Sequence, residues 1–242
     1  MRIAFFSDVH ANLPALEAFF KDVATENVDV IYCLGDLVGY NVWPNEVVDE
    51  IRKRHIPTIM GNHDEALVYP ISTKNQISNK GLTQTLVNLE NREYLINLPR
   101  HLFLSFNLNE EPFNILMVHG SVRAINDYMV VDYPKEEVLD MMQSQQADML
   151  FCGHTHKPFH RVIEDGNSFR HVVNIGSVGK PKDGDIRICY VILELNQSTS
   201  KLDPKTLNVS FKRVEYNVEK AAKAVEESEF DSSFADALRL GK

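Results

Sequence analysis

Five clusters of Asp, His and Asn residues each follow directly after a short apolar run. In chain order they contain Asp8 and His10, then Asp36, then Asn62, His63 and Asp64, then His119, and last His154 and His156. Carboxylate, imidazole and amide donors without a thiolate favour Mn, Fe, Zn, Ni or Co over a calcium cage or an iron–sulfur centre. These ligands are too many for one ion. Two ions about 3.5–4 Å apart would share a carboxylate, clamp an anionic group and lower the pKa of a bridging water, which predicts hydrolysis of a phosphorus ester by in-line attack.

The third cluster contains residues that we expect to do more than bind metal. Gly61 permits a tight turn at the end of the preceding run, and the amide of Asn62 offers a neutral oxygen ligand. His63 is then free to face the substrate, and we expect Asp64 to hold its imidazole and favour the charged form. Taken alone, this cluster also suits a helix N-cap at Asn62. The shared position of all five clusters after apolar runs favours the metal site.

The apolar runs before the clusters are candidates for buried strands. They lie at residues 3–6, 30–34, 56–60, 114–118 and 149–152. Helices are predicted after Asn12 as N-cap, with Pro14 in the first turn, and from Pro44. This β-α-β-α-β order over residues 2–60 implies parallel strands with right-handed crossovers. Because sites in open α/β sheets form outside the carboxyl ends of the strands, we expect the clusters to converge.

The rest of the chain adds peripheral helices and antiparallel strands. A mostly helical insertion is expected at about 69–99, overhanging the site, with four leucines as core candidates: Leu82, Leu86, Leu89 and Leu95. A strand at 102–108 and a helix at 134–143 are predicted next. Asp165-Gly166 marks a hairpin between strands at 159–163 and 169–174, and long strands follow at 186–195 and 207–216. One helix with a loose end is expected at about 217–242. The prediction is an α/β (α+β) fold, a single domain over 1–242 with two packed sheets and helices outside.

Composition excludes several classes of protein. The formal net charge of −9 lacks the basic footprint of a general nucleic-acid binder, although bound cations would still attract an anionic substrate. Cys33, Cys152 and Cys189 lie in apolar runs without metal-ligand spacing, which indicates buried thiols in a reduced compartment. No signal-peptide pattern and no run of about 20 apolar residues occurs, so we expect a cytoplasmic protein without a membrane partner. A nucleophile elbow, a Walker A loop and His-Glu-x-x-His are all missing from the sequence.

The ordered motifs D-x-H, G-D, G-N-H-D, H and G-H-x-H, from Asp8 to His156, resemble those of the calcineurin-like metallophosphoesterase superfamily. The chain looks closest to its small bacterial and archaeal phosphodiesterase-like branch. That branch often shows G-D-x-V-G-Y, found here from Gly35 to Tyr40, and a late G-S-V-G followed by D-G-D, found here at 176–179 and 183–185. The resemblance covers roughly residues 1–195. It implies a four-layer αββα sandwich of two mixed β-sheets flanked by helices.

The resemblance also implies a role for each motif residue. The first ion would be held by Asp8, His10 and His156, and the second by Asn62, His119 and His154. Asp36 would bridge the two ions. His63 would contact the phosphoryl oxygen and act as general acid for the leaving group. The implied cofactors are two divalent transition metal ions, with Mn, Fe, Ni, Zn and Co all open.

The chain departs from the pattern of the branch only outside the expected ligands. The departures are Asn41 and Val42 after Gly39-Tyr40, Val122 and Ala124 after His119, Ile175, and Lys182 where Arg is frequent. Candidate substrate contacts are Tyr40, Trp43, Arg123 and Tyr128, each with ordinary packing as its alternative.

The leading hypothesis is a phosphoesterase acting on phosphodiester or small nucleotide-type substrates through metal-activated hydroxide. A phosphomonoesterase or protein phosphatase is an alternative, weakened because no Arg follows Gly35-Asp36 closely. A dinucleoside polyphosphate hydrolase stays open. A scaffold that binds partners without catalysis is the alternative outside enzymes. The expected partner is a small phosphorylated substrate, and a homo-oligomer is possible.

Overall fold

Two mixed β-sheets form the centre of the protein. The computed structural model describes residues 1–70 and 78–242. The first sheet has the order β2 (Val30–Cys33), β1 (Arg2–Phe6), β8 (Ile188–Glu194) and β9 (Asn208–Val214). The second has the order β3 (His101–Leu108), β4 (Glu111–Val118), β5 (Met149–Cys152), β7 (Ser168–Asn174) and β6 (Phe159–Asp165). Strands β1 and β2 are parallel, as are β4, β5 and β7, and the remaining pairs are antiparallel.

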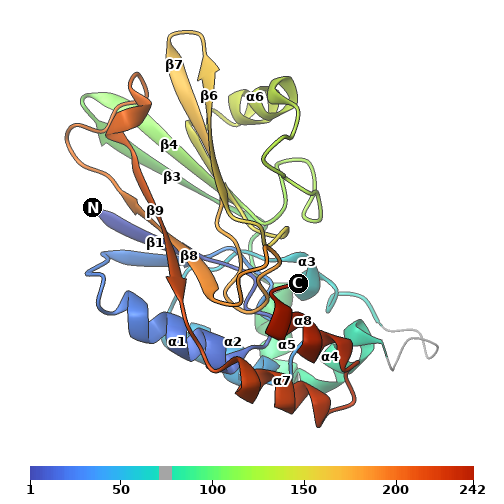
Figure 1. Cartoon of the computed structure of the whole chain (residues 1–242). Helices are drawn as coiled ribbons and strands as arrows, with labels where there is room; N and C mark the ends of the chain where they lie inside the picture. The colour runs from blue at the N-terminus through green and yellow to red at the C-terminus, as the bar shows by residue number, and fades with distance from the viewer. Residues whose placement is uncertain (71–77) are drawn as a thin grey trace.

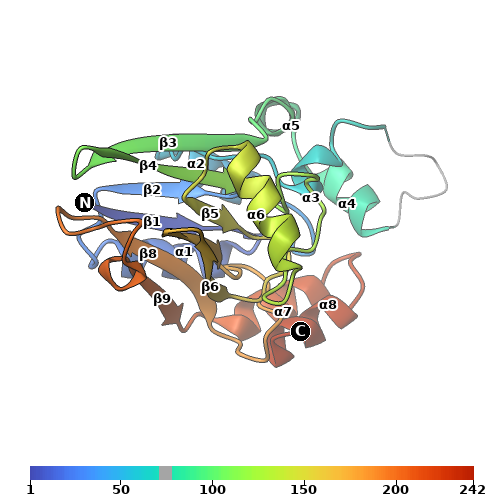
Figure 2. The same ribbon diagram turned by 90° about the horizontal axis from the view of Figure 1, so that it is seen from above.

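Helices cover the outer faces of both sheets, as Figures 1 and 2 show. The helices are α1 (Leu13–Val23), α2 (Pro44–Lys53), α3 (Asn62–Glu65), α4 (Asn79–Leu86), α5 (Leu89–Ile96), α6 (Lys135–Ser144), α7 (Val218–Glu226) and α8 (Ser233–Leu240). One apolar cluster lies under α1 and α2, a second contains residues of both sheets, and a third lies under α6. The predicted α/β sandwich of two mixed sheets with flanking helices is confirmed.

Local signals for the first crossover are confirmed. The side chain of Asn12 caps α1 by accepting a hydrogen bond from the backbone N–H of Ala15, with Pro14 in the first turn. Leu16, Phe19 and Val23 follow at helical spacing and are buried against β1 and β2. The crossover therefore places the carboxyl ends of β1 and β2 side by side.

The strand predicted at 56–60 is not formed. Only Thr58 makes a bridge, to Cys33 at the end of β2. Pro57 lacks an N–H and supplies only its carbonyl, which accepts a hydrogen bond from Cys33, and Met60 instead donates to the carbonyl of Pro99. The segment still runs beside β2 and delivers the third cluster to the site.

The insertion and the C-terminus also differ from expectation. Within the insertion, residues 71–77 lie outside the described residues, and α4 and α5 are two short helices because Asn88 caps a new start. Leu82 and Leu95 are buried as predicted, but Leu86 and Leu89 are 41% and 85% exposed. The C-terminus forms two helices rather than one with a loose end, because α7, α8 and α4 share an apolar cluster of their own. Figure 1 shows these helices together beside the loops at the strand ends.

Two further predictions concern membrane-spanning helices and the cysteine thiols. Among the described residues, no helix is long and apolar enough to cross a membrane. Cys33, Cys152 and Cys189 are free and buried, as predicted.

Candidate metal centre

The predicted ligands converge at the carboxyl ends of β1, β2, β4 and β5. Backbone hydrogen bonds join their loops: Asp8 N–H donates to the carbonyl of Gly35 at 2.9 Å, and His10 N–H donates to that of Asp36 at 2.9 Å. Gly153 N–H donates to the carbonyl of His119 at 2.8 Å, which joins the ends of β4 and β5. Clusters far apart in sequence therefore form one site.

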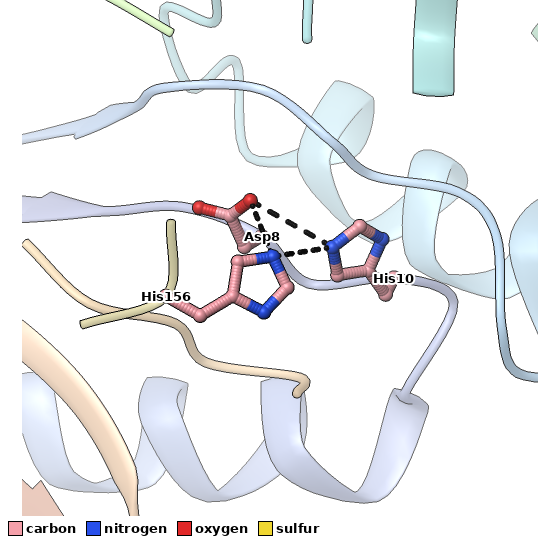
Figure 3. A group of neighbouring side chains, drawn as sticks. All are labelled: Asp8, His10 and His156. Carbon is pink, nitrogen blue, oxygen red and sulfur yellow. Dashed lines mark hydrogen bonds and ion pairs between the residues drawn. The ribbon is translucent and has the colours of Figure 1, made fainter. Parts of the chain in front are cut away.

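The first group of ligand atoms comes from Asp8, His10 and His156 (Figure 3). Asp8 Oδ1 lies 3.1 Å from His156 Nε2 and 3.7 Å from His10 Nε2. The two imidazole Nε2 atoms are 3.1 Å apart. All three side chains are buried, so the group has the size and the donors of a metal site.

The second group comes from Asp36, His119 and His154, with Asn62 beside it. His119 Nε2 lies 3.3 Å from Asp36 Oδ2 and 3.2 Å from the amide oxygen of Asn62. Asp36 Oδ2 is also 3.7 Å from His10 Nε2 of the first group. Asp36 therefore stands between the groups, where a bridging carboxylate would be.

Three of the imidazoles are oriented by backbone carbonyls. His10 Nδ1 lies 3.0 Å from the carbonyl of Val38, and His119 Nδ1 lies 2.7 Å from that of Leu34. His156 Nδ1 contacts the carbonyl of Lys180. A carbonyl requires Nδ1 to carry the proton, which leaves Nε2 free to ligate and directs it into the centre.

Two buried atoms of the centre have no hydrogen-bond partner among the described residues. They are Asp8 Oδ1 and His154 Nε2. An unpaired buried acceptor is costly, and a metal ion at the centre would satisfy both. The donor set therefore fits a divalent transition ion.

Charged groups in the centre shift one another's pKa. Burial acts to raise the pKa of Asp36, but His119, His63 and His10 overcome it and hold that pKa well below its usual range. Burial likewise acts to lower the pKa of His119, yet the Asp36 carboxylate and then Asp8 raise it to about 10. The carboxylates thus hold positive charge at the position where a cation is expected.

The backbone at the centre is strained. Five predicted ligands adopt left-handed conformations, with φ of 56° at Asp8, 49° at His10, 55° at Asp36, 63° at His154 and 60° at His156. Such conformations cost roughly 1–3 kcal/mol each for residues with a Cβ and cluster at functional sites. These conformations direct the side chains of neighbouring ligands towards the same centre.

His63 and Asp64 differ from the prediction. The carboxylate of Asp64 accepts hydrogen bonds from the backbone N–H groups of Asp36, Leu37 and Gly61, so it does not hold the imidazole of His63. Burial lowers the pKa of His63 to about 3, so the charged form is not favoured. Asp64 instead fixes the loop that carries Asp36.

The ring of His63 nevertheless faces the centre. It lies 4.9 Å from the ring of His10 and 4.8 Å from that of Tyr40, between centroids. Gly39, at φ 97°, leaves room for it, because a Cβ there would stand 2.6 Å from His63 Nδ1. His63 also offers a nitrogen within 4.8 Å of ligand atoms of His10 and Asp36.

Of the four candidate substrate contacts, two lie at the centre. The ring of Tyr40 is 4.9 Å from that of His10, and the ring of Tyr128 is 4.5 Å from that of His154. Arg123 pairs with Glu137 on α6, and Trp43 precedes α2, where its backbone N–H donates to the carbonyl of Ala11.

Sequence reasoning missed the supporting polar groups. Asn41 donates its amide to the carbonyl of His10 at 2.8 Å, and Ser177 Oγ donates to the carbonyl of Asp8 at 2.8 Å. The only available signals were the departure at Asn41 and the G-S-V-G motif around Ser177.

The fold and this site place the chain in one class of protein. The calcineurin-like phosphoesterase superfamily domain matches residues 1–198, so the chain belongs to this superfamily. Its members are typically metal-dependent hydrolases, and the buried His and Asp groups fit a metal site of that kind.

Three relatives cover nearly the whole chain. A metallophosphoesterase of solved structure from Sphaerobacter thermophilus is 30% identical over 100% of both chains, with a TM-score of 0.81. A hypothetical protein from Pyrococcus horikoshii OT3 is 21% identical over 100% of this chain and 98% of its own, with a TM-score of 0.80, and supports the fold alone. An uncharacterized protein from Methanocaldococcus jannaschii is 30% identical over 99% of this chain and 98% of its own.

Proposed function

We propose that the protein is a dinuclear metal-dependent phosphoesterase that hydrolyses phosphodiester or small nucleotide-type substrates. The observation that carries this proposal is Asp36, whose carboxylate stands between two groups of buried ligand atoms. Two bound divalent ions would hold phosphoryl oxygens and supply a nucleophile at neutral pH. The membership of the superfamily and the similarity to a metallophosphoesterase support the same reaction class.

Other residues of the chain have separate roles in the proposed reaction. His10, His119 and His156, oriented by carbonyls, fix the ligand geometry. His63 stands beside His10 without a hydrogen bond from its ring to any described residue, so its imidazole is available to a phosphoryl oxygen. The ring of Tyr40 packs against that of His63, with 4.8 Å between centroids, and helps to position it. The proposed setting is the cytoplasm, which the three free thiols support.

The test compares Asp36→Ala with His63→Gln. Turnover of bis-p-nitrophenyl phosphate with Mn or Ni is measured together with the metal content of each purified variant. Asp36→Ala is expected to lose both bound metal and turnover, because it removes the shared ligand. His63→Gln is expected to keep its metal while turnover falls about 10²–10⁴-fold, the range for loss of a general acid or base.

Each outcome bears on a different part of the proposal. Unchanged turnover in Asp36→Ala would overturn the proposed function. Loss of metal in His63→Gln would make His63 a ligand, which its distance to His10 and Asp36 also permits. Metal binding without turnover on diester, monoester, cyclic nucleotide or dinucleoside polyphosphate would favour the non-catalytic scaffold.

A further inference from the structure

Lys182 lies beside Tyr40, at the edge of the metal centre. Its ammonium nitrogen is 6.0 Å from the centroid of the Tyr40 ring, and that ring is 4.8 Å from the ring of His63. Burial lowers the pKa of Lys182, and the carboxylates of Asp8 and Asp36 act in the opposite sense. The ammonium therefore stands within the electrostatic field of the centre.

This ammonium has no hydrogen bond and no ion pair to any residue in 1–70 or 78–242. The two acidic residues that follow it in the chain are already paired, Asp183 with Arg213 and Asp185 with Arg187. The neighbouring Lys180 differs, because its Nζ donates to the carbonyl of Lys242 at 2.8 Å. A partly buried cation without a partner at the edge of the centre is available to bind an anion.

The charge of the loaded centre narrows the choice of anion. Two divalent ions outweigh the carboxylates of Asp8 and Asp36 and a metal-activated hydroxide by one positive charge while the ligating imidazoles are neutral. A diester has one negative charge and would balance that excess. The ammonium of Lys182 would then still lack a counter-charge, which a second phosphate of the substrate would supply.

Residues of several elements contact Tyr40, the residue beside Lys182. Phe234 of α8 packs edge-on against Tyr40 with 5.0 Å between centroids, and the ammonium of Lys180 lies 5.1 Å from the same ring. The backbone N–H of Tyr40 donates to the side chain of Asn79 on α4 at 2.9 Å. Contacts with α4 and α8 thus hold Tyr40 in place, and the ammonium of Lys182 lies near its ring.

We infer that Lys182 and the ring of Tyr40 form a subsite for a second phosphate of the substrate, so the substrate class is a nucleotide-type phosphoanhydride. The inference rests on the proposed function, because it takes the His63 side as the side of the leaving group. Water attacks the scissile phosphorus and the bond to the bridging oxygen breaks. The second phosphate leaves with that oxygen and its electron pair, facing Lys182. The attacked phosphorus keeps the hydroxyl, and the other proton of the water passes to solvent.

The test uses three probes that separate charge on the leaving group from charge on the attacked phosphorus. ATP has a phosphate in its leaving group, p-nitrophenyl phosphate has its extra charge on the attacked phosphoryl group, and bis-p-nitrophenyl phosphate has neither. Lys182→Met is expected to lower kcat/KM for ATP about 10–100-fold, the effect of losing a charge-assisted hydrogen bond, and to change the other two by less than about 3-fold. Lys182→Arg should retain the ATP activity.

A binding measurement and a matched control complete the design. Calorimetry with the methylene analogue of ADP, at equal metal content, should show the same selective loss in Lys182→Met. Lys135→Met removes an exposed lysine at the start of α6, away from the centre, and should leave all three probes unchanged. An equal fall on all three probes, or no fall on ATP, overturns the subsite. Wild-type turnover of bis-p-nitrophenyl phosphate without turnover of ATP overturns it too, while no turnover of any probe overturns the proposed function itself.

Discussion

Two regions of this molecule contain histidines in mutual contact, and only one of them also brings carboxylates to the imidazoles. At the strand ends, imidazoles meet the carboxylates of Asp8 and Asp36. In the β6–β7 hairpin, His160 Nε2 lies 2.9 Å from His171 Nδ1, and His171 Nε2 is buried without a hydrogen-bond partner among the described residues. The hairpin pair lies within strands, where His171 stands opposite Met149 and Val162.

One histidine in each region shows the difference most clearly, because the pKa values of His119 and His171 shift in opposite directions. Burial lowers the pKa of His171 to about 4, and the charge of His160 adds to the effect. At the centre, burial acts in the same sense on His119, but the carboxylates raise its pKa to about 10. Burial and imidazole contact are common to both regions, so nearby carboxylates distinguish a cation site from a packed histidine pair.

Removal of metal should affect only the first region, and the effect should be the largest. With free metal about 100-fold above Kd, each bound ion stabilises the folded protein by about 3 kcal/mol, so chelation should lower Tm and abolish turnover. Thermal unfolding with and without Mn measures this difference. His171→Gln is the matched control and should keep the full metal-dependent shift in Tm. A smaller shift in that variant would show that the hairpin pair binds metal as well.

The two regions also show what a sequence reveals. The runs before Asp8, Asp36, His119 and His154 predicted the strand ends, because apolar periodicity and neighbouring ligands are local in the chain. Asp64 was assigned wrongly, since its partners at Asp36 and Leu37 lie 28 and 27 residues away. The left-handed backbone of the ligands and the carbonyls behind their imidazoles have no side-chain signature. They arise from loops that meet only in the folded protein.

Acidification should lower the stability of the protein through the β6–β7 histidine pair, with a smaller effect than removal of metal. The folded pKa of His171, about 4, is below its unfolded value of about 6.5, so the unfolded state binds more protons between these values. Stability is therefore fully present above pH 6.5 and falls as the pH drops towards 4, by up to about 3 kcal/mol for this group. Urea unfolding of metal-free protein at pH 7 and pH 4.5 measures the loss. His171→Gln should show a shallower pH dependence, and an equal slope in both proteins would contradict the assignment.

Substitution of Arg123 should have the smallest effect on turnover, although its sequence position suggested a substrate contact. In the structure it lies on the loop after His119 and lines a cavity with it, but its guanidinium pairs with Glu137 of α6, and both side chains are 44% exposed. A paired, exposed arginine contributes little, so Arg123→Gln should leave kcat/KM within about 2-fold on ATP and on bis-p-nitrophenyl phosphate. Lys182→Met, which removes an unpaired cation beside Tyr40, is the contrast to measure in parallel. A fall of 10-fold or more in Arg123→Gln would mean that Arg123 leaves Glu137 to bind substrate, and that pairing in the structure does not decide which cations recognise the phosphate.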